Sequence, residues 1–291
     1  VVQVRAQNSY DDFLPSMIVR IAPSDDTVFR LAYTRSVGRP NYAQLSPSGS
    51  LSYEDGSAAG TFEGSISFGN PNLKPYRSDN FDATAEWYFA KGGLLSIGVF
   101  AKFIKNPIFT QSFTQNNVTL DGRTYEILRT PQPLNADRGD IVGIEAQYQQ
   151  QFTFLPGLLS GFGVSLTGTL TNSTLRLTDG RTSTFPSQSR YLYGAELFYQ
   201  RGPIEGSIAY HNTGRSLLAA GAIDYQDQYN DDLRRLDAKI SVALSDNIRI
   251  FAEAQNLTDE PTRQYQGGRQ DWVIQNERYG RTYYGGISVK L

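Results

Sequence analysis

The sequence predicts an all-β protein, a transmembrane antiparallel up-and-down β-barrel with about twelve strands. Apolar and polar residues alternate with a period of two, as they do in strands with two different faces. The segment from 81 to 89 places Phe81, Ala83, Ala85, Trp87 and Phe89 on one such face. Short turns and long polar loops follow one another in turn, which is typical of outer-membrane barrels. No apolar run approaches the roughly 18 residues that a spanning helix needs.

The predicted strands are mostly about ten residues long, whereas strands of soluble sheets commonly have about five or six. In order, we expect strands at about 1–7, 12–22, 27–35, 79–90, 94–104, 140–153, 161–174, 190–200, 203–212, 233–244, 247–256 and 280–291.

The connections between these strands predict the orientation of the chain. Short turns are expected at 24–26, 91–93, 201–203 and 245–247, with a slightly longer one near 155–157. Long polar loops are expected at 36–78, 105–139, 175–189, 213–232 and 257–279. Because outer-membrane barrels have short periplasmic turns and long extracellular loops, the last strand should end on the periplasmic side.

The alternation also predicts what each face of the sheet meets. In a barrel the apolar face meets lipid, and we expect it to carry no charge, because Arg or Lys at the bilayer midplane costs about 2–4 kcal/mol. A soluble β-sandwich binding module shows the same alternation. Strand length and aromatic rings at strand ends, such as Trp87 and Tyr283, favour the barrel. Its polar, lumen-facing charged residues include Glu145, Glu196, Asp237, Lys239, Arg249 and Glu253.

Composition excludes several classes of function. With 27 Lys+Arg against 29 Asp+Glu, the chain lacks the basic excess of a nucleic-acid binder. The absence of cysteine excludes disulfides, thiolate metal sites and cysteine nucleophiles. His211 is the one histidine, and its parity places it on the polar face with Glu205 and Ser207. We therefore expect no enzyme, no cofactor and no metal site.

Three long loops carry candidate ligand-binding residues, since loops on a rigid scaffold are common recognition sites. They combine aromatic rings with hydrogen-bonding groups, a mixture that suits a sugar or a polar chelate. The acidic run 224–232 is also a possible Ca²⁺ ligand set, although it lacks EF-hand spacing. The candidates are Tyr53, Glu54, Asp55, Tyr225, Asp227, Tyr229, Asp231, Tyr265, Arg269, Asp271 and Trp272.

The hairpin near residue 246 gives a testable register. A three-residue turn at 245–247 places Leu244 opposite Ile248 and Lys239 opposite Glu253. This arrangement predicts a cross-strand ion pair on the lumen side, and opposite charges so placed contribute roughly 0.2–1 kcal/mol. A slip by one residue would push both charges into lipid, so the pair would fix the register.

Six motifs resemble the C-terminal barrel of TonB-dependent outer-membrane receptors, and they occur in the order found in that family. Two differences are Tyr76, where Glu is usual, and a C-terminal Leu291, where Phe is usual. The motifs are Tyr10–Ser16, Tyr33–Arg35 followed by Gly38–Tyr42, Gly69–Pro75 (GNPNLKP), Gly143–Glu145, Asn256–Asp259 and Gly280–Tyr283.

The resemblance implies a 22-stranded barrel in the outer membrane of a Gram-negative bacterium, filled by an N-terminal plug. On this interpretation residues 1–291 are its C-terminal sector, without the plug, the TonB box and the first strands. It implies active import of a scarce ligand such as a siderophore, vitamin or oligosaccharide. Partners are then outer-membrane lipid, the small-molecule ligand, the plug and the TonB complex. A passive porin-like channel or an independent 12-stranded barrel, closed by pairing of 1–7 with 280–291, are the alternatives.

Overall fold

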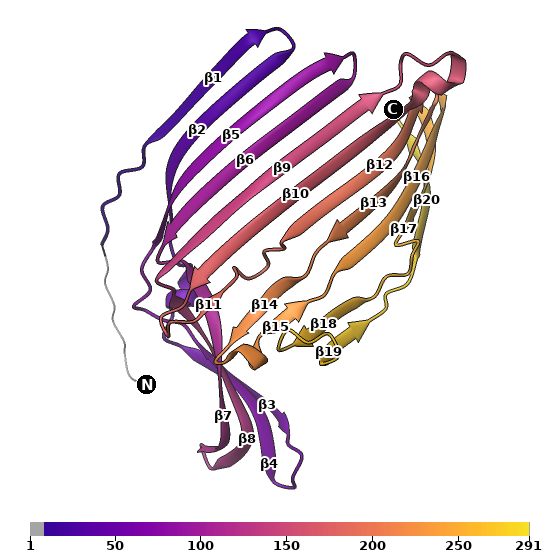
Figure 1. The fold of residues 1–291 in the computed structure, drawn as a ribbon. Coiled ribbons are helices and arrows are strands. Elements are labelled where there is room, and N and C mark those ends of the chain that lie inside the picture. The colour runs from indigo at the N-terminus through magenta and orange to yellow at the C-terminus, as the bar shows by residue number, and fades with distance from the viewer. Residues whose placement is uncertain (1–8, 291) are drawn as a thin grey trace.

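A computed structural model describes residues 9–290 and shows a long curved sheet continued by a second, smaller sheet (Figure 1). Eleven antiparallel strands form the main path of the curved sheet, and each strand pairs with its successor along this path. The short β11 (Thr182–Ser183) adds to β10. Along the path the eleven strands are β1 (Ser16–Ser24), β2 (Thr27–Gly38), β5 (Tyr76–Ala90), β6 (Gly93–Lys105), β9 (Arg138–Gln151), β10 (Phe162–Arg176), β12 (Tyr191–Arg201), β13 (Ile204–Thr213), β16 (Leu233–Ser245), β17 (Ile248–Gln255) and β20 (Thr282–Val289).

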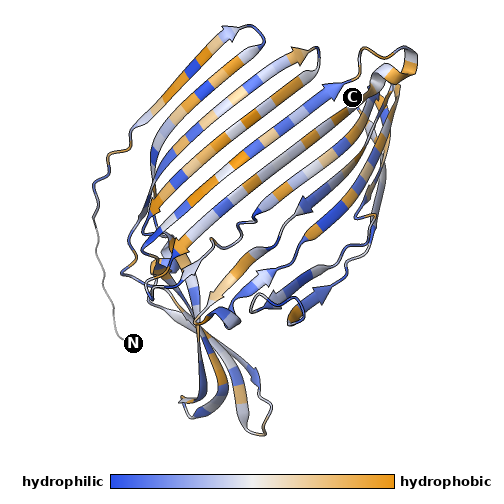
Figure 2. Ribbon diagram, in the orientation of Figure 1, coloured by the Kyte–Doolittle hydropathy of each residue, from blue (hydrophilic) through white to orange (hydrophobic). Residues whose placement is uncertain are grey.

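These strands confirm the predicted pattern, because each falls within a few residues of an expected range. The alternation separates the two faces, and Figure 2 shows apolar and polar residues alternating along the strands. Large apolar side chains on the outer face are exposed, for example Leu170 at 60% and Ile240 at 53%. An exposed apolar face of this extent is what a wall in contact with lipid requires. Within the described residues, no helix is long and apolar enough to span a bilayer.

The two edges of the curved sheet are not joined to each other in the part of the chain that is described. Between residues 9 and 290, β1 pairs only with β2, and β20 pairs only with β17. The predicted strand 1–7, and its pairing with 280–291, lie outside the described residues. An unpaired strand edge cannot face hydrocarbon, because its N–H and C=O groups need partners. We therefore propose that this chain is a sector of a larger barrel.

The expectation of a charge-free outer face is wrong at one end of the sheet. Within the expected strand ranges, five charged residues have the parity of the lipid-facing side chains, and all lie at or beside the strand ends that lead into long loops: Arg35, Asp79, Asp140, Arg234 and Arg281. Two of them, Arg35 and Asp79, approach each other to 3.7 Å. Since charge is costly only within the hydrocarbon, these residues mark where the outer face leaves the membrane.

Aromatic rings form a belt at each end of the apolar face. Near the short turns, Phe89 stacks on Tyr148 with ring centroids 5.8 Å apart, and Phe162 contacts Tyr199 at 4.9 Å. Near the long loops, Tyr33 contacts Phe81 at 5.1 Å, and further rings lie at the same level on neighbouring strands. Amphipathic rings gather at membrane interfaces, so the two belts delimit the membrane-spanning part.

The hairpin register is confirmed, but its turn differs from the prediction. Lys239 lies opposite Glu253, as expected, while a bulge near Leu244 brings Ser245 opposite Ile248 and leaves a two-residue turn. The bulge reconciles this tight turn with the separation of faces. Among the described residues, no ion pair joins Lys239 to Glu253, so the predicted salt bridge is wrong. Arg249 instead pairs with Glu205 on β13, at 2.6 Å.

The predicted long polar loops contain strands that form an eight-stranded second sheet beyond one end of the curved sheet (Figure 1). Parallel pairs, β4 with β8 and β14 with β7, join hairpins from different loops. In sheet order its strands are β19 (Val273–Glu277), β18 (Thr262–Gln266), β15 (Gln228–Asn230), β14 (Ser216–Gly221), β7 (Ile108–Leu120), β8 (Arg123–Asn135), β4 (Thr61–Phe68) and β3 (Gly49–Asp55).

A small apolar core lies where the two sheets meet. It contains Phe109, Ala136, Leu175 and Leu177, each at most 4% exposed, with Leu134 and Phe185 packed against them. The helical segments are short: α1 (Tyr42–Leu45), η1 (Gly157–Gly161) and η2 (Asp224–Gln226). The base of the second sheet is thus fixed to the rim of the barrel wall.

Candidate ligand-binding face

The second sheet brings together the candidate residues of two predicted loops. Tyr225 lies in η2, Tyr229 in β15 and Tyr265 in the adjacent β18. Tyr229 and Tyr265 stack with ring centroids 5.5 Å apart. The remaining candidates of these loops lie in or beside the same strands: Asp227, Asp231, Arg269, Asp271 and Trp272. We refer to these eight residues and the strands that carry them, β14, β15, β18 and β19, as the candidate face.

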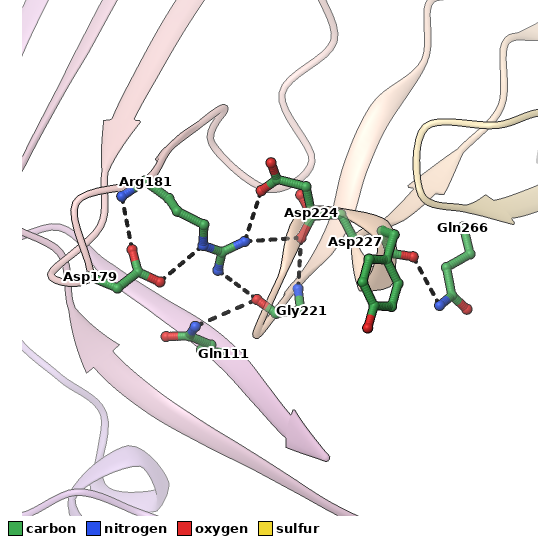
Figure 3. Close-up of polar contacts among 8 residues, drawn as sticks. Gln111, Asp179, Arg181, Gly221, Asp224, Asp227 and Gln266 are labelled. Atoms are coloured by element: carbon green, nitrogen blue, oxygen red, sulfur yellow. Dashed lines mark hydrogen bonds and ion pairs between the residues drawn. The ribbon is translucent and has the colours of Figure 1, made fainter.

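One arginine that the sequence pattern did not single out holds this face together. The guanidinium of Arg181, from the loop after β10, donates from Nε to Asp179 at 2.9 Å and from Nη1 to Asp224 at 3.1 Å (Figure 3). Its Nη2 donates to the carbonyl of Gly221 at 2.7 Å. The amide of Gln111 on β7 reaches the same carbonyl at 3.5 Å. Arg181 therefore links its own loop to the segment at the end of β14, and Gln111 of β7 reaches that segment through the same carbonyl.

Asp227 is a buried acidic component of the same network. Its carboxylate accepts a hydrogen bond from the N–H of Gly221 at 2.8 Å and lies 4.0 Å from the Arg181 guanidinium. Burial raises the pKa of Asp227, and the hydrogen bond from Gly221 and the charge of Arg181 oppose that rise. Asp227 thus has a structural role, and its carboxylate is not presented to solvent.

The β18–β19 turn is attached to the other side of the network. The N–H of Gly267 donates to the carbonyl of Asp227 at 2.8 Å, and the Gln266 amide donates to the carbonyl of Tyr225 at 3.1 Å. Gly267 has φ of 64°, and a Cβ there would lie 3.1 Å from the Trp272 ring. Glycine is needed at this position for both conformation and space.

The exposed part of the candidate face combines aromatic rings with a paired arginine and aspartate. Tyr225 is 58% exposed and Trp272 is 43% exposed. The guanidinium of Arg269 lies 4.7 Å from the centre of the Trp272 ring and pairs with Asp271 at 2.8 Å. Flat rings beside paired charges can stack on a planar ligand and fix its orientation by hydrogen bonds.

The acidic residues of the run 224–232 accept hydrogen bonds from other side chains of the protein. Asp231 accepts from Arg263 at 3.1 Å and from the Gln270 amide at 2.9 Å. Asp232 accepts from the Tyr191 hydroxyl at 2.8 Å. No group of three or more His, Cys, Asp or Glu side chains in residues 9–290 is arranged to hold a metal ion. The possible Ca²⁺ site in this acidic run therefore has no support in the described chain.

The third candidate loop lies at the opposite edge of the second sheet. Tyr53, Glu54 and Asp55 belong to β3, whereas the other candidates gather around β15, β18 and β19. Tyr53 packs edge-on to Phe62 at 5.4 Å, and the guanidinium of Arg123 lies 4.8 Å from its ring centre. This second aromatic cluster is separate from the candidate face.

The lumen-facing candidates occupy the inner parity of the curved sheet. Glu196, Asp237, Lys239 and Glu253 line one cavity of about 260 Å³ together with His211. Arg249 is engaged with Glu205, and Glu145 lies on β9 opposite Thr169 of β10. The polar lining agrees with the inside of a large barrel.

Glu126 is another residue that the sequence pattern did not reveal, and it stabilises the β3–β4 turn. Its carboxylate accepts from the Ser57 hydroxyl at 2.6 Å, from the Ala58 N–H at 2.8 Å and from the Thr61 hydroxyl. Hydrogen bonds from Ser57, Thr61 and Ala58 lower the pKa of Glu126 to about 2. Because this value lies below the ordinary 4.5, the carboxylate stabilises the turn above about pH 4.5 and loses this effect as the pH falls toward about 2.

Replacement of Glu126 should loosen this turn without disturbing the barrel. We expect Glu126→Ala to increase proteolytic cleavage within 56–61 at pH 7 several-fold, with Glu126→Gln between that variant and wild type. Cleavage sites are read by mass spectrometry of the full-length protein. Asp121→Ala at the β7–β8 turn is the control. Equal cleavage of 56–61 in all four proteins would contradict the role of Glu126.

The fold and the two aromatic belts define an outer-membrane β-barrel, and comparison with known proteins gives the family. The family model described as TonB dependent receptor-like β-barrel matches residues 2–257, so the chain belongs to this family. Its members are receptors and transporters of the outer membrane, not enzymes. The curated proteins contain no match.

Several solved receptors share the fold. A mutant of the ferric enterobactin receptor PfeA from Pseudomonas aeruginosa, in complex with enterobactin, has a TM-score of 0.65 and 18% identity, covering 96% of this chain and 40% of its own. The siderophore receptor PirA from Acinetobacter baumannii has a TM-score of 0.64 and 15% identity, and the match covers 96% of this chain and 41% of PirA. The ferric-catecholate import receptor Fiu from E. coli K12 has a TM-score of 0.61 and 14% identity, and the match covers 94% of this chain and 34% of Fiu. This chain therefore spans about two fifths or less of these receptors.

Proposed function

We propose that this chain is the C-terminal barrel sector of a receptor that actively imports a siderophore-type ferric chelate. The observation that carries the proposal is the candidate face, which places the rings of Tyr225 and Trp272 and the Arg269 guanidinium on the extracellular side of a family barrel. The solved receptors of similar fold are siderophore and ferric-catecholate receptors, which supports this class of ligand.

In the proposed mechanism these residues bind the ligand and do not drive transport. The aromatic rings supply apolar contact area, and hydrogen-bonding groups fix the orientation of the chelate. The polar lumen surface, with Glu196, Asp237 and Lys239, contacts a plug supplied by the rest of the receptor. The TonB complex then releases the plug with energy from the inner membrane.

Iron-limited growth tests this function directly. We expect that deletion of the receptor gene abolishes growth on at least one ferric siderophore as the iron source, and that loss of TonB has the same effect. Trp272→Ala should lower affinity for that chelate about tenfold, which corresponds to loss of one stacked ring of about 1.4 kcal/mol. Uptake that persists without TonB would favour a passive channel. Growth on every chelate tested, in the deletion strain, would contradict the proposal.

A further inference from the structure

Four basic residues face one another across four neighbouring strands of the barrel wall. Arg77 of β5 lies opposite Lys105 of β6, Lys105 opposite Arg138 of β9, and Arg138 opposite Arg176 of β10. Adjacent strands are about 4.8 Å apart, so the four charges form a continuous row. We call these four residues the basic row.

The basic row lies on the outer face of the sheet. Its members share the parity of the exposed Phe103 and Val142, which are 47% and 42% exposed. Their inward neighbours face the opposite side: Leu175 belongs to the buried core, and a Cβ on Gly139 would meet the ring of Phe185. Lys105, Arg138 and Arg176 are themselves exposed.

Most of the row has no compensating charge within the protein. Arg77 pairs with Asp12 at 2.5 Å, but no carboxylate of residues 9–290 forms an ion pair with Lys105, Arg138 or Arg176. The nearest acidic residues along the chain are Asp137 and Asp140. Like charges directly opposite each other on neighbouring strands are destabilising, so this arrangement calls for an external anion.

An apolar groove begins two rows below the basic row. The row between the basic row and the groove lies two residues along each strand toward the membrane and contains Asp79, Phe103, Asp140 and Thr174. The groove beyond it has a volume of about 940 Å³. Its lining includes Tyr33, Phe81, Ala101, Val142 and Leu170. Successive rows on one face lie about 6.8 Å apart along the strand. The basic row therefore lies just above the hydrocarbon, at the level of lipid headgroups.

We propose that the basic row binds the phosphate of an anionic lipid of the outer leaflet, with an acyl chain of that lipid in the groove beneath. Lys105, Arg138 and Arg176 supply the positive charge, and charge-assisted hydrogen bonds to phosphate oxygens relieve their mutual repulsion. Tyr33 and Phe81 mark the depth at which the headgroup gives way to the acyl chain. The site is distinct from the candidate face and does not depend on the transported ligand.

The test uses the full-length receptor, purified in an uncharged detergent and titrated with bisphosphorylated lipid A. Native mass spectrometry counts the bound lipid. We expect the triple variant Lys105→Gln, Arg138→Gln, Arg176→Gln to bind at least tenfold more weakly than wild type. A matched variant with the same loss of charge, Arg20→Gln, Lys91→Gln, Lys290→Gln, should bind like wild type. Asp140→Asn should bind more tightly, because it removes a nearby negative charge.

A second measurement separates lipid binding from a structural role. Without lipid, the triple variant should be at least as heat-stable as wild type, because it removes like-charge repulsion. Added lipid A should raise the Tm of wild type more than that of the triple variant, whereas dephosphorylated lipid A or inorganic phosphate should act equally on both. Equal lipid binding by wild type and the triple variant, or equal losses in the triple and matched variants, would overturn the proposal.

Discussion

Replacement of Arg181 by alanine is expected to release the extracellular hairpins from one another. The change leaves Asp179, Asp224 and the buried Asp227 without their shared cation. Asp179 and Asp224 are exposed, so the main cost comes from the buried Asp227. A buried group left without its partner costs about 2 kcal/mol, which corresponds to roughly 30-fold more frequent local opening. Hydrogen exchange of the amides of 217–230 and of Gly267 measures this opening. Ligand affinity should fall together with protection, because both loops of the candidate face lose their anchor.

Two further variants show whether charge or shape is decisive at this position. Arg181→Lys keeps the charge but cannot donate to Asp179, Asp224 and Gly221 with one planar group, so it should be intermediate. Arg190→Ala, in the same loop segment, should exchange like wild type. Protection unchanged in Arg181→Ala would show that the hairpins are held by their strand pairing alone.

A charge on the outer face of β10 is expected to have the second large effect. Leu166 is 43% exposed and lies on the outer face of β10, between Phe162 near the short turn and Thr174 near the long loop, so Leu166→Arg places a guanidinium within the hydrocarbon. The expected cost is about 2–4 kcal/mol in the free energy of unfolding. Urea titration of the full-length receptor in phospholipid vesicles measures this value, and the folded fraction is read from heat-modifiable gel mobility.

The neighbouring residue provides a matched control. Thr167 has the opposite parity and lies opposite Gly194 and Gln147 on the neighbouring strands. The next residues on the same face of β10 lie opposite two acidic residues, Glu196 and Glu145. Thr167→Arg therefore adds the same charge to a polar, acidic surface and should cost less than about 0.5 kcal/mol. Equal destabilisation by the two variants would contradict the assignment of outer and inner faces.

The barrel wall could be predicted from the sequence because lipid on one side and a polar lumen on the other impose a strict period of two. The second sheet could not, because its buried side chains, such as Leu217 and Ala220 of β14, are not spaced at alternate positions along the strand. The β7 sequence IFTQSFTQNNVTL, for example, is too polar to show alternation. The sequence does contain one indication of this sheet, the dipeptide Asp121-Gly122, which is typical of tight hairpin turns. Both residues have positive φ in the structure.

The candidate site was predictable only in part, for a related reason. Aromatic residues in loops such as Tyr225 and Trp272 stand out by type, so they could be selected from the sequence. Arg181 does not stand out, because its partners Asp224 and Gly221 are about 40 residues away along the chain. Contacts between distant backbone groups, such as the hydrogen bond from the N–H of Ser187 to the carbonyl of Leu217 at 2.7 Å, bring these segments together, and no local pattern encodes such contacts.

The parallel pairs between hairpins limit how this surface can change during evolution. β4 borders β8, and β14 borders β7, so the hairpin of residues 108–135 lies between two others. A deletion that shortened this hairpin would leave the edges of β4 and β14 unpaired, and unpaired strand edges can pair with other molecules. Surface variation that evades phages or antibodies is therefore expected at hairpin tips such as Asp121-Gly122. Gains and losses of whole loops should instead occur in concert.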